Sequence, residues 1–225
     1  MRTIVHVSDL HFGRVDPALL GPLKRTIERI GPDLVVVSGD LTQRARAGQF
    51  RAARSFLDSL PGRRLVVPGN HDVPLWNLAA RVFFPYAGYR RAVSKDLEPS
   101  YIDDEIAVFG VNTAHGFTTK HGKVGSAQLE RLRGRLAEVR GAQVKILVMH
   151  HFTAELAALG ADVLVAGHVH ATRVQSGATL VVEAGTATSR RTRGEPNAFN
   201  VLTVTGRRVA VEHYKLRGGD FARAA

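Results

Sequence analysis

The chain has 225 residues and a formal net charge of +11, and 44% of its residues are hydrophobic and 23% charged. This composition is ordinary for a globular protein and excludes intrinsic disorder and a collagen-like chain. The chain has no cysteine, which excludes disulfides, thiolate zinc sites, iron–sulfur clusters and cysteine nucleophiles. Because it has neither a run of eighteen apolar residues nor a recognisable signal peptide, we expect no membrane span and a cytoplasmic location.

The first seventy residues alternate between apolar runs and segments of helical period. Strands are predicted at residues 3–7, 33–38 and 64–67, because each is short and strongly apolar. Helices are predicted between them at residues 17–30 and 44–60, which end at Gly-Pro and Pro-Gly pairs. A β-α-β-α-β order of this kind predicts parallel strands with right-handed crossovers.

The remainder of the chain is less regular. We expect partial helix at 74–93, strands at 100–103 and 105–112, a helix at 126–140, and strands at 144–149 and 163–166. Short runs at 179–183, 199–205 and 208–216 predict strands with antiparallel pairing. With no repeat or linker along the chain, we predict one α/β domain over residues 1–225, with two sheets packed face to face and helices outside.

Polar side chains follow five of the predicted strands, and ligands of open α/β sheets bind beyond the carboxyl ends of the strands. Each of these residues alone has an ordinary interpretation as a cap, a turn or a structural histidine. Their conjunction is harder to explain by chance, since six of the ten histidines fall in these segments. The candidate residues are Asp9, His11, Asp40, Asn70, His71, Asp72, His150, His151, His168 and His170.

The donor atoms of this set are carboxylate and amide oxygens and imidazole nitrogens. Such a set suits Mn, Fe, Zn, Co or Ni rather than copper(I). A carboxylate can bridge two ions, and a pair of ions is well suited to phosphoryl transfer. The sequence therefore predicts a site for two divalent or trivalent transition-metal ions.

The pattern D-x-H … G-D … G-N-H-D … H … G-H-x-H, which spans residues 9–170, resembles the signature of calcineurin-like metallophosphoesterases. Residues 38–42 and 68–72 are most similar to the bacterial cyclic-nucleotide (class III) phosphodiesterase branch. The resemblance implies a four-layer α/β/β/α sandwich of two mixed sheets. One departure is the segment 152–166, which is shorter than in similar relatives and could be a true loop deletion.

The resemblance also implies a role for each residue of the pattern. It implies that His71 contacts the phosphate and assists the leaving group, that Asp72 either orients His71 or shapes a turn, and that His151 supports His150. It implies a first ion held by Asp9, His11 and His170, a second held by Asn70, His150 and His168, and Asp40 bridging both.

The function implied is hydrolysis of small phosphodiesters, with 3′,5′-cyclic nucleotides as expected substrates, by a metal-bridging hydroxide that attacks phosphorus. One alternative is a nuclease or nucleic-acid end-processing enzyme, which the charge supports but which the lack of an aromatic-rich basic stretch disfavours. Another is a non-catalytic scaffold, and the protein is expected as a monomer or homodimer. The residues expected to shape the substrate pocket are Arg14, Asn112, Thr113, His115 and those of the loop 186–196.

Overall fold

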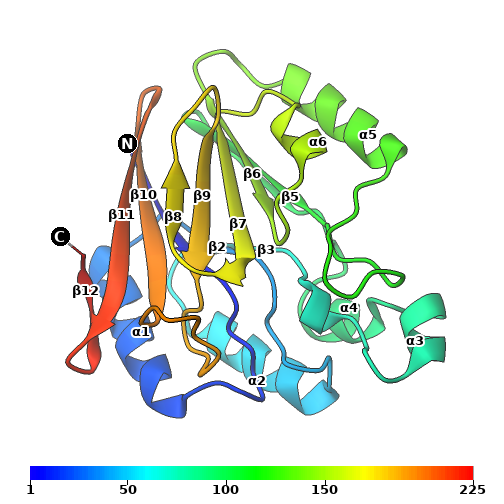
Figure 1. The fold of residues 1–225 in the computed structure, drawn as a ribbon. Helices are drawn as coiled ribbons and strands as arrows, with labels where there is room; N and C mark the ends of the chain where they lie inside the picture. The colour runs from blue at the N-terminus through cyan, green and yellow to red at the C-terminus, as the bar shows by residue number, and fades with distance from the viewer. Residues whose placement is uncertain (225) are drawn as a thin grey trace.

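A computed structural model describes residues 1–224 and places the strands in two six-stranded mixed sheets (Figure 1). The first sheet has the order β12-β11-β10-β1-β2-β3, in which β1 to β3 are parallel and the others antiparallel. Its strands are β1 (Arg2–Val7), β2 (Leu34–Val37), β3 (Arg63–Val66), β10 (Ala198–Thr205), β11 (Arg208–Arg217) and β12 (Asp220–Arg223).

The second sheet has the order β4-β5-β6-β7-β9-β8, with four parallel central strands and an antiparallel strand at each edge. Its strands are β4 (Ser100–Ile102), β5 (Ile106–Val111), β6 (Val144–Met149), β7 (Val163–His170), β8 (Arg173–Gln175) and β9 (Leu180–Gly185). The carboxyl ends of the parallel strands of both sheets lie at the same edge of the sandwich. This is shown by the residues that follow these strands, whose side chains come close to one another.

Helices cover both outer faces. Helices α1 (Pro17–Ile30) and α2 (Ala47–Asp58) lie on the first sheet, and α5 (Ser126–Ala137) and α6 (Ala154–Ala157) lie on the second (Figure 1). A 3₁₀ turn, η1 (Asn70–Asp72), follows β3. Two short helices, α3 (Leu78–Phe83) and α4 (Ala87–Ala92), lie at one side of the molecule (Figure 1). Within residues 1–224, no helix is long and apolar enough to cross a membrane.

The buried apolar side chains form three separate layers, as a four-layer sandwich requires. Alternation along β2 shows how: Leu34 and Val36 face the second sheet, whereas Val35 and Val37 pack under α1 and α2. A third layer joins β5 to β7 with α5 and α6, with Phe109 and Leu132 among its members. The predicted α/β sandwich of two mixed sheets is therefore confirmed.

Several element boundaries differ from those predicted. Residues 74–93 are helical in part, as predicted, and the helical residues form two short helices separated at Pro85. The predicted strand at 179–183 pairs in parallel with β7 as well as antiparallel with β8, so the antiparallel prediction was only partly correct there. Strand β7 continues to His170 through an irregularity after Ala166, beyond its predicted end. The short elements α6, β8 and β12 were not predicted. The segment 152–166, which the sequence analysis found to be short, contains helix α6.

Candidate metal centre

Side chains that follow parallel strands of both sheets converge on one buried point. Asp9 and His11 follow β1, Asp40 follows β2, and His150 follows β6; all four are at most 1% exposed. Strand β7 contributes His168 and His170 from its irregular end. The structure thus brings together residues that are up to 161 positions apart in the sequence. Their donor atoms form overlapping groups, and two that share no residue are Asp9–His11–His170 and His150–His151–His168. Asp40 belongs to two further groups, one with His11 and His71 and one with Asp9 and His150.

The first group contains Asp9, His11 and His170. The Oδ1 atom of Asp9 lies 3.0 Å from His170 Nε2 and 3.5 Å from His11 Nε2. The two imidazole nitrogens face each other at 3.2 Å. Asp9 Oδ1 is buried yet accepts no hydrogen bond of good geometry from the described residues, whereas Oδ2 accepts from the Ser8 hydroxyl and the His168 amide. A buried carboxylate oxygen aimed at two imidazoles fits a metal ligand.

The second group contains Asn70, His150, His151 and His168. Asn70 Oδ1 lies 3.1 Å from Nε2 of both His150 and His151. The ring centres of His151 and His168 are 4.5 Å apart, and those of His150 and His168 are 5.3 Å apart. The sequence predicts that His151 supports His150 rather than binding metal. The structure brings its ring within reach of His150 and His168, and its Nδ1 lies 3.1 Å from Thr113 Oγ1.

Asp40 lies between the two groups. Its Oδ2 atom is 3.3 Å from His150 Nε2 and 3.7 Å from His11 Nε2. Its other oxygen, Oδ1, accepts a hydrogen bond of 2.8 Å from the His71 amide. One carboxylate oxygen therefore faces both groups, which is the position that a bridging ligand needs.

Backbone carbonyls fix the tautomers of three histidines. Nδ1 lies 2.7 Å from the Ser38 oxygen in His150, 2.7 Å from the Arg191 oxygen in His170, and 2.9 Å from the Gln43 oxygen in His71. A carbonyl can only accept, so in each ring Nδ1 carries a proton, and Nε2 presents its lone pair whenever the ring is neutral. This arrangement orients metal-binding histidines and strengthens them as donors.

The backbone at the site is held in an uncommon conformation. Among the described residues only six non-glycine residues have φ in the left-handed region, and five of them are candidate ligands. Their φ values are 54° for Asp9, 48° for His11, 53° for Asp40, 71° for His168 and 58° for His170. Such conformations cost energy and gather at functional sites, where the surrounding structure enforces them.

Two glycines let the strand ends approach one another. A Cβ on Gly69 would meet the backbone and carboxylate of Asp40, and one on Gly167 would meet Ser8 Oγ and the Asp9 carboxylate. Asp40 and Asp9 are candidate ligands, and Ser8 precedes Asp9 in the same loop. A side chain in place of Gly69 or Gly167 would therefore displace a candidate ligand.

The charges of the centre depend on one another. Burial alone would raise the pKa of Asp40, but the adjacent His150 and His11 lower it well below its usual range. Burial likewise opposes the charge of His150, yet Asp40 and Asp9 raise the pKa of that imidazole to about 9. A protonated histidine thus balances two buried carboxylates. A metal cation would take over this balance and release the proton, so the residues present fit the ions that the sequence predicts.

His71 and Asp72 occupy different settings. His71 lies beside the first group, its ring 4.9 Å from that of His11, and its Nε2 lies 3.1 Å from the Arg191 guanidinium. The Asp72 carboxylate instead accepts hydrogen bonds from the backbone amides of residues 41, 42 and 69 and from the Thr42 hydroxyl. The predicted catalytic role of Asp72 in orienting His71 is therefore not supported by the geometry. Its carboxylate joins two ligand-bearing loops, and the Gln43 carbonyl orients His71.

A cleft of about 640 Å³ opens beside the two groups, and no acidic residue lines it. Of the residues expected to shape the pocket, Arg14 and the loop 186–196 contribute, whereas Asn112, Thr113 and His115 do not line it. Gln43, Arg44 and Lys120 were not predicted, because nothing in their local sequence distinguishes them from surface residues. The cleft is lined by Arg14, Gln43, Arg44, Asn70, His71, Val73, Leu75, Thr119, Lys120, His168, Arg191 and Arg193.

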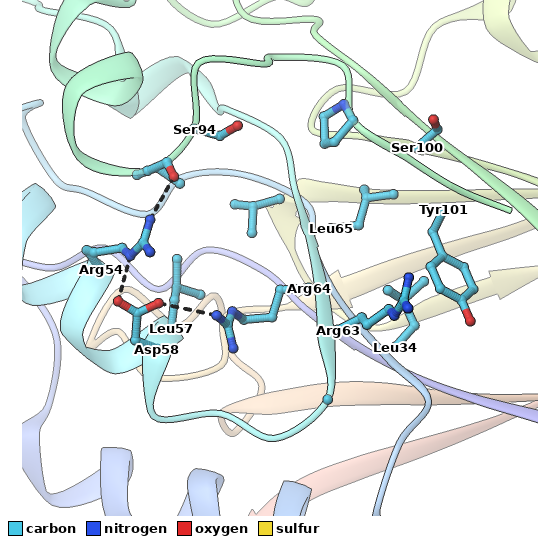
Figure 2. Close-up of a pocket in the computed structure, with 14 residues that line it drawn as sticks. Leu34, Arg54, Leu57, Asp58, Arg63, Arg64, Leu65, Ser94, Ser100 and Tyr101 are labelled. Carbon is cyan, nitrogen blue, oxygen red and sulfur yellow. Dashed lines mark hydrogen bonds and ion pairs between the residues drawn. The ribbon is translucent and has the colours of Figure 1, made fainter.

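A second cavity of about 530 Å³ lies along β3 and beside Leu34, the first residue of β2 (Figure 2). Its cations have partners already: Arg54 and Arg64 both pair with Asp58, and the Arg63 guanidinium lies 5.6 Å from the centre of the Tyr101 ring. Figure 2 shows Asp58 joined to both Arg54 and Arg64. None of the candidate metal ligands lines this cavity, so the cleft at the carboxyl ends remains the candidate site.

Comparison with known proteins identifies the family. The sequence model of the calcineurin-like phosphoesterase family matches residues 2–172. The chain is 35% identical over 82 residues to glycerophosphodiester phosphodiesterase GpdQ of Enterobacter lignolyticus, covering 31% of this chain and 29% of that protein. It is 36% identical over 72 residues to UDP-2,3-diacylglucosamine pyrophosphatase LpxG of Chlamydia muridarum, covering 31% and 22%. The matches span less than a third of either relative's length.

Solved structures share the fold. Purple acid phosphatase PPD1 from yellow lupin superposes with a TM-score of 0.72 at 15% identity, covering 99% of this chain and 52% of that chain. Vps29 from Chaetomium thermophilum superposes with a TM-score of 0.56 at 16% identity, covering 99% and 93%. At these identities the likeness concerns the fold alone.

Proposed function

Because the chain belongs to the calcineurin-like phosphoesterase family, we propose that it is a dinuclear metal-dependent phosphodiesterase, with 3′,5′-cyclic nucleotides among its substrates. The observation that carries the proposal is the position of Asp40, whose Oδ2 atom faces both groups of donors. A single-ion site would have no need of a second group of imidazoles on the far side of this carboxylate.

The two groups would each hold one ion. We assign Asp9, His11 and His170 to one ion, His150, His168 and Asn70 to the other, and Asp40 to both. When bound, the ions supply Lewis acidity that neutralises the phosphoryl oxygens and activates water at neutral pH. His151 is close enough to the second group to support Asn70 through the 3.1 Å contact with its amide oxygen.

His71 and Arg191 would act on the substrate itself. With Nδ1 donating to the Gln43 carbonyl, Nε2 of His71 is the nitrogen that would hold a proton for the leaving ester oxygen once the Arg191 guanidinium turns from it to the substrate. Arg191 meets that same atom at 3.1 Å, and its guanidinium can pair with a phosphoryl oxygen once substrate enters. Its backbone carbonyl also orients His170, so this residue connects substrate binding with the metal centre.

The cleft carries five basic residues and no acidic one, which suits a phosphate monoester or diester over an uncharged ester. The preference for a diester rests on one comparison. The relative with 35% identity over 82 residues bears the name of a phosphodiesterase. The same basic cleft would accept a nucleic-acid strand, so a polynucleotide substrate is the alternative that the test must separate.

A substrate panel with the manganese-loaded protein tests the proposal. It compares cyclic AMP, 2′,3′-cyclic nucleotides, bis(p-nitrophenyl) phosphate, p-nitrophenyl phosphate and single-stranded DNA. We expect turnover of the small diesters, loss of activity with a chelator and recovery with Mn²⁺. A monoester cleaved far faster than every diester would make the protein a phosphatase. Preferred cleavage of DNA would make it a nuclease, and inactivity on all substrates with two ions bound would indicate a scaffold.

A further inference from the structure

The segment around α3 has the reverse of the usual burial pattern. Its apolar side chains face solvent: Trp76 is 78% exposed, Leu78 70%, Phe83 72% and Phe84 68%. Arg81, the only charged residue between positions 73 and 89, is 5% exposed. In an ordinary surface helix the apolar residues would point inward. Four large exposed apolar side chains within nine residues therefore need an explanation beyond packing.

Arg81 explains how this segment stays ordered. Its guanidinium donates one hydrogen bond of 2.9 Å to the Pro74 carbonyl and another to the Thr118 carbonyl. Gly116 packs against the Arg81 backbone, and the neighbouring Phe117 is 72% exposed. The arginine thus fixes the loop 115–119 to α3, and both carry exposed apolar groups. We call the set Trp76, Leu78, Val82, Phe83, Phe84 and Phe117 the α3 face.

All charged residues in the two segments that form the α3 face are basic. Between Asp72 and Asp96 the charged residues are Arg81, Arg90, Arg91 and Lys95, and between Glu105 and Glu130 they are Lys120 and Lys123. The face also adjoins the basic cleft, since Leu75 and Lys120 line it. A second copy of the chain packed face to face would bring cations against cations, because a two-fold contact pairs like with like.

We propose that the α3 face docks on the surface of an anionic lipid bilayer. Exposed Trp, Phe and Leu side chains beside lysines and arginines are the combination that enters the interface of such a membrane. The aromatic groups would bury among the headgroups and upper acyl chains, and the cations would remain with the lipid phosphates. The docked protein would hold its cleft at the membrane surface.

The chain provides its own reporter for this test, because Trp76 is its only tryptophan. The full-length protein is titrated with vesicles of phosphatidylcholine alone and with vesicles containing phosphatidylglycerol. With the anionic vesicles we expect Trp76 emission to shift to the blue and to be quenched by brominated lipids. Raising the salt concentration should weaken the binding, because screening reduces the attraction of the cations.

The double variant Phe83→Ser with Phe84→Ser should reduce partitioning into the vesicles about tenfold or more, because two aromatic side chains that would enter the bilayer are lost. Hydrolysis of bis(p-nitrophenyl) phosphate in solution should be unchanged, because neither residue lines the cleft. The matched control is Ile102→Ser, at a position 56% exposed on an edge strand of the second sheet, which should bind vesicles like the parent protein.

Three outcomes would overturn the proposal. The first is no change in Trp76 emission with anionic vesicles, and the second is equal binding to neutral vesicles. The third is a blue shift that grows with protein concentration in the absence of lipid, which would mean that a second copy covers the face. The proposed phosphodiesterase activity is measured on a soluble substrate, so its success or failure is independent of these results.

Discussion

At the level of single residues, the left-handed backbone of the candidate ligands implies that the site stores strain. His168, with φ of 71°, can be replaced without disturbing a buried core, since it is partly exposed. Alanine keeps the strain and glycine removes it. In the presence of a chelator, His168→Gly should therefore have a free energy of unfolding about 1 kcal/mol higher than His168→Ala. Urea denaturation measures both, and an alanine variant as stable as the glycine variant would argue against stored strain.

His71 should differ from the metal ligands in its response to substitution. In His71→Ala both ions should remain bound, because its Nδ1 is tied to the Gln43 carbonyl and its Nε2 faces Arg191. We expect a rate loss of ~10²–10⁴ for cyclic AMP, whose alkoxide leaving group needs a proton. The loss should be smaller for a nitrophenyl ester, whose leaving group departs without one.

Metal analysis and both rates are measured on the same preparation of the His71 variant. Asp40→Ala is the matched control and should lose metal as well as activity, since its carboxylate faces both groups. Equal rate losses for the two leaving groups would remove the proton-donor role and leave phosphate binding. Loss of an ion from His71→Ala would make this histidine a ligand.

Single residues also show where sequence reasoning succeeds. The convergence of Asp9, Asp40 and His150 could be predicted, because each lies within three residues of the end of an apolar strand. Asp72 and His151 could not be resolved, because a residue beside a ligand can face the site or the scaffold, and only the turn geometry decides. Arg191 lies in a loop without pattern, and its contact with His71 spans 120 positions.

At the level of elements, Asp103 connects the first strand of one sheet with the β4–β5 turn of the other. Its carboxylate accepts hydrogen bonds from Arg2, from the Tyr101 hydroxyl and from the amides of Glu105 and Ile106. Burial alone would raise the pKa of Asp103, but these bonds outweigh it and lower the pKa to about 2. The ionised form is therefore stabilised by folding.

The sign of this linkage gives a pH dependence. Because the pKa of Asp103 falls on folding, its contribution is complete above the unfolded value of 3.8 and is lost as the pH falls towards about 2. At pH 6, Asp103→Asn should lower the free energy of unfolding by about 1–2 kcal/mol. Urea denaturation from pH 6 to pH 2 should show the two proteins converge. A difference that stays constant over this range would contradict the assigned pKa.

Elements also show which parts of the fold pattern alone can predict. Strand β2 could be predicted because it is buried along its whole length and is therefore entirely apolar. Helix α1 could be predicted because it buries one face, which gives its apolar residues a helical spacing. The orientation of α3 could not be predicted from its hydrophobic pattern, because its apolar residues face solvent and its arginine is buried. The end of β7 is also invisible in the sequence, since its irregular register depends on pairing with β9.

At the level of the whole molecule, the candidate centre joins the two sheets. Asp9, Asp40 and Asn70 come from the sheet that contains β1 to β3, whereas His150, His168 and His170 come from the sheet that contains β6 and β7. Ions bound between them would resist separation of the sheets. Metal at about 1,000 times its dissociation constant stabilises a folded protein by about 4 kcal/mol, which corresponds to roughly 10 °C in thermal midpoint at this size.

The metal-dependent stabilisation should be largely lost when either sheet loses a ligand. Asp9→Ala removes a donor from the first sheet and His150→Ala removes one from the second, so each should lose most of the metal-dependent rise in thermal midpoint. His213→Ala, on β11 and outside both groups, should retain it. Calorimetry with chelator and with excess Mn²⁺ gives the rise for each protein. If Asp9→Ala were stabilised as much as the parent, the ions would bind elsewhere, and the joining of the sheets through this centre would be wrong.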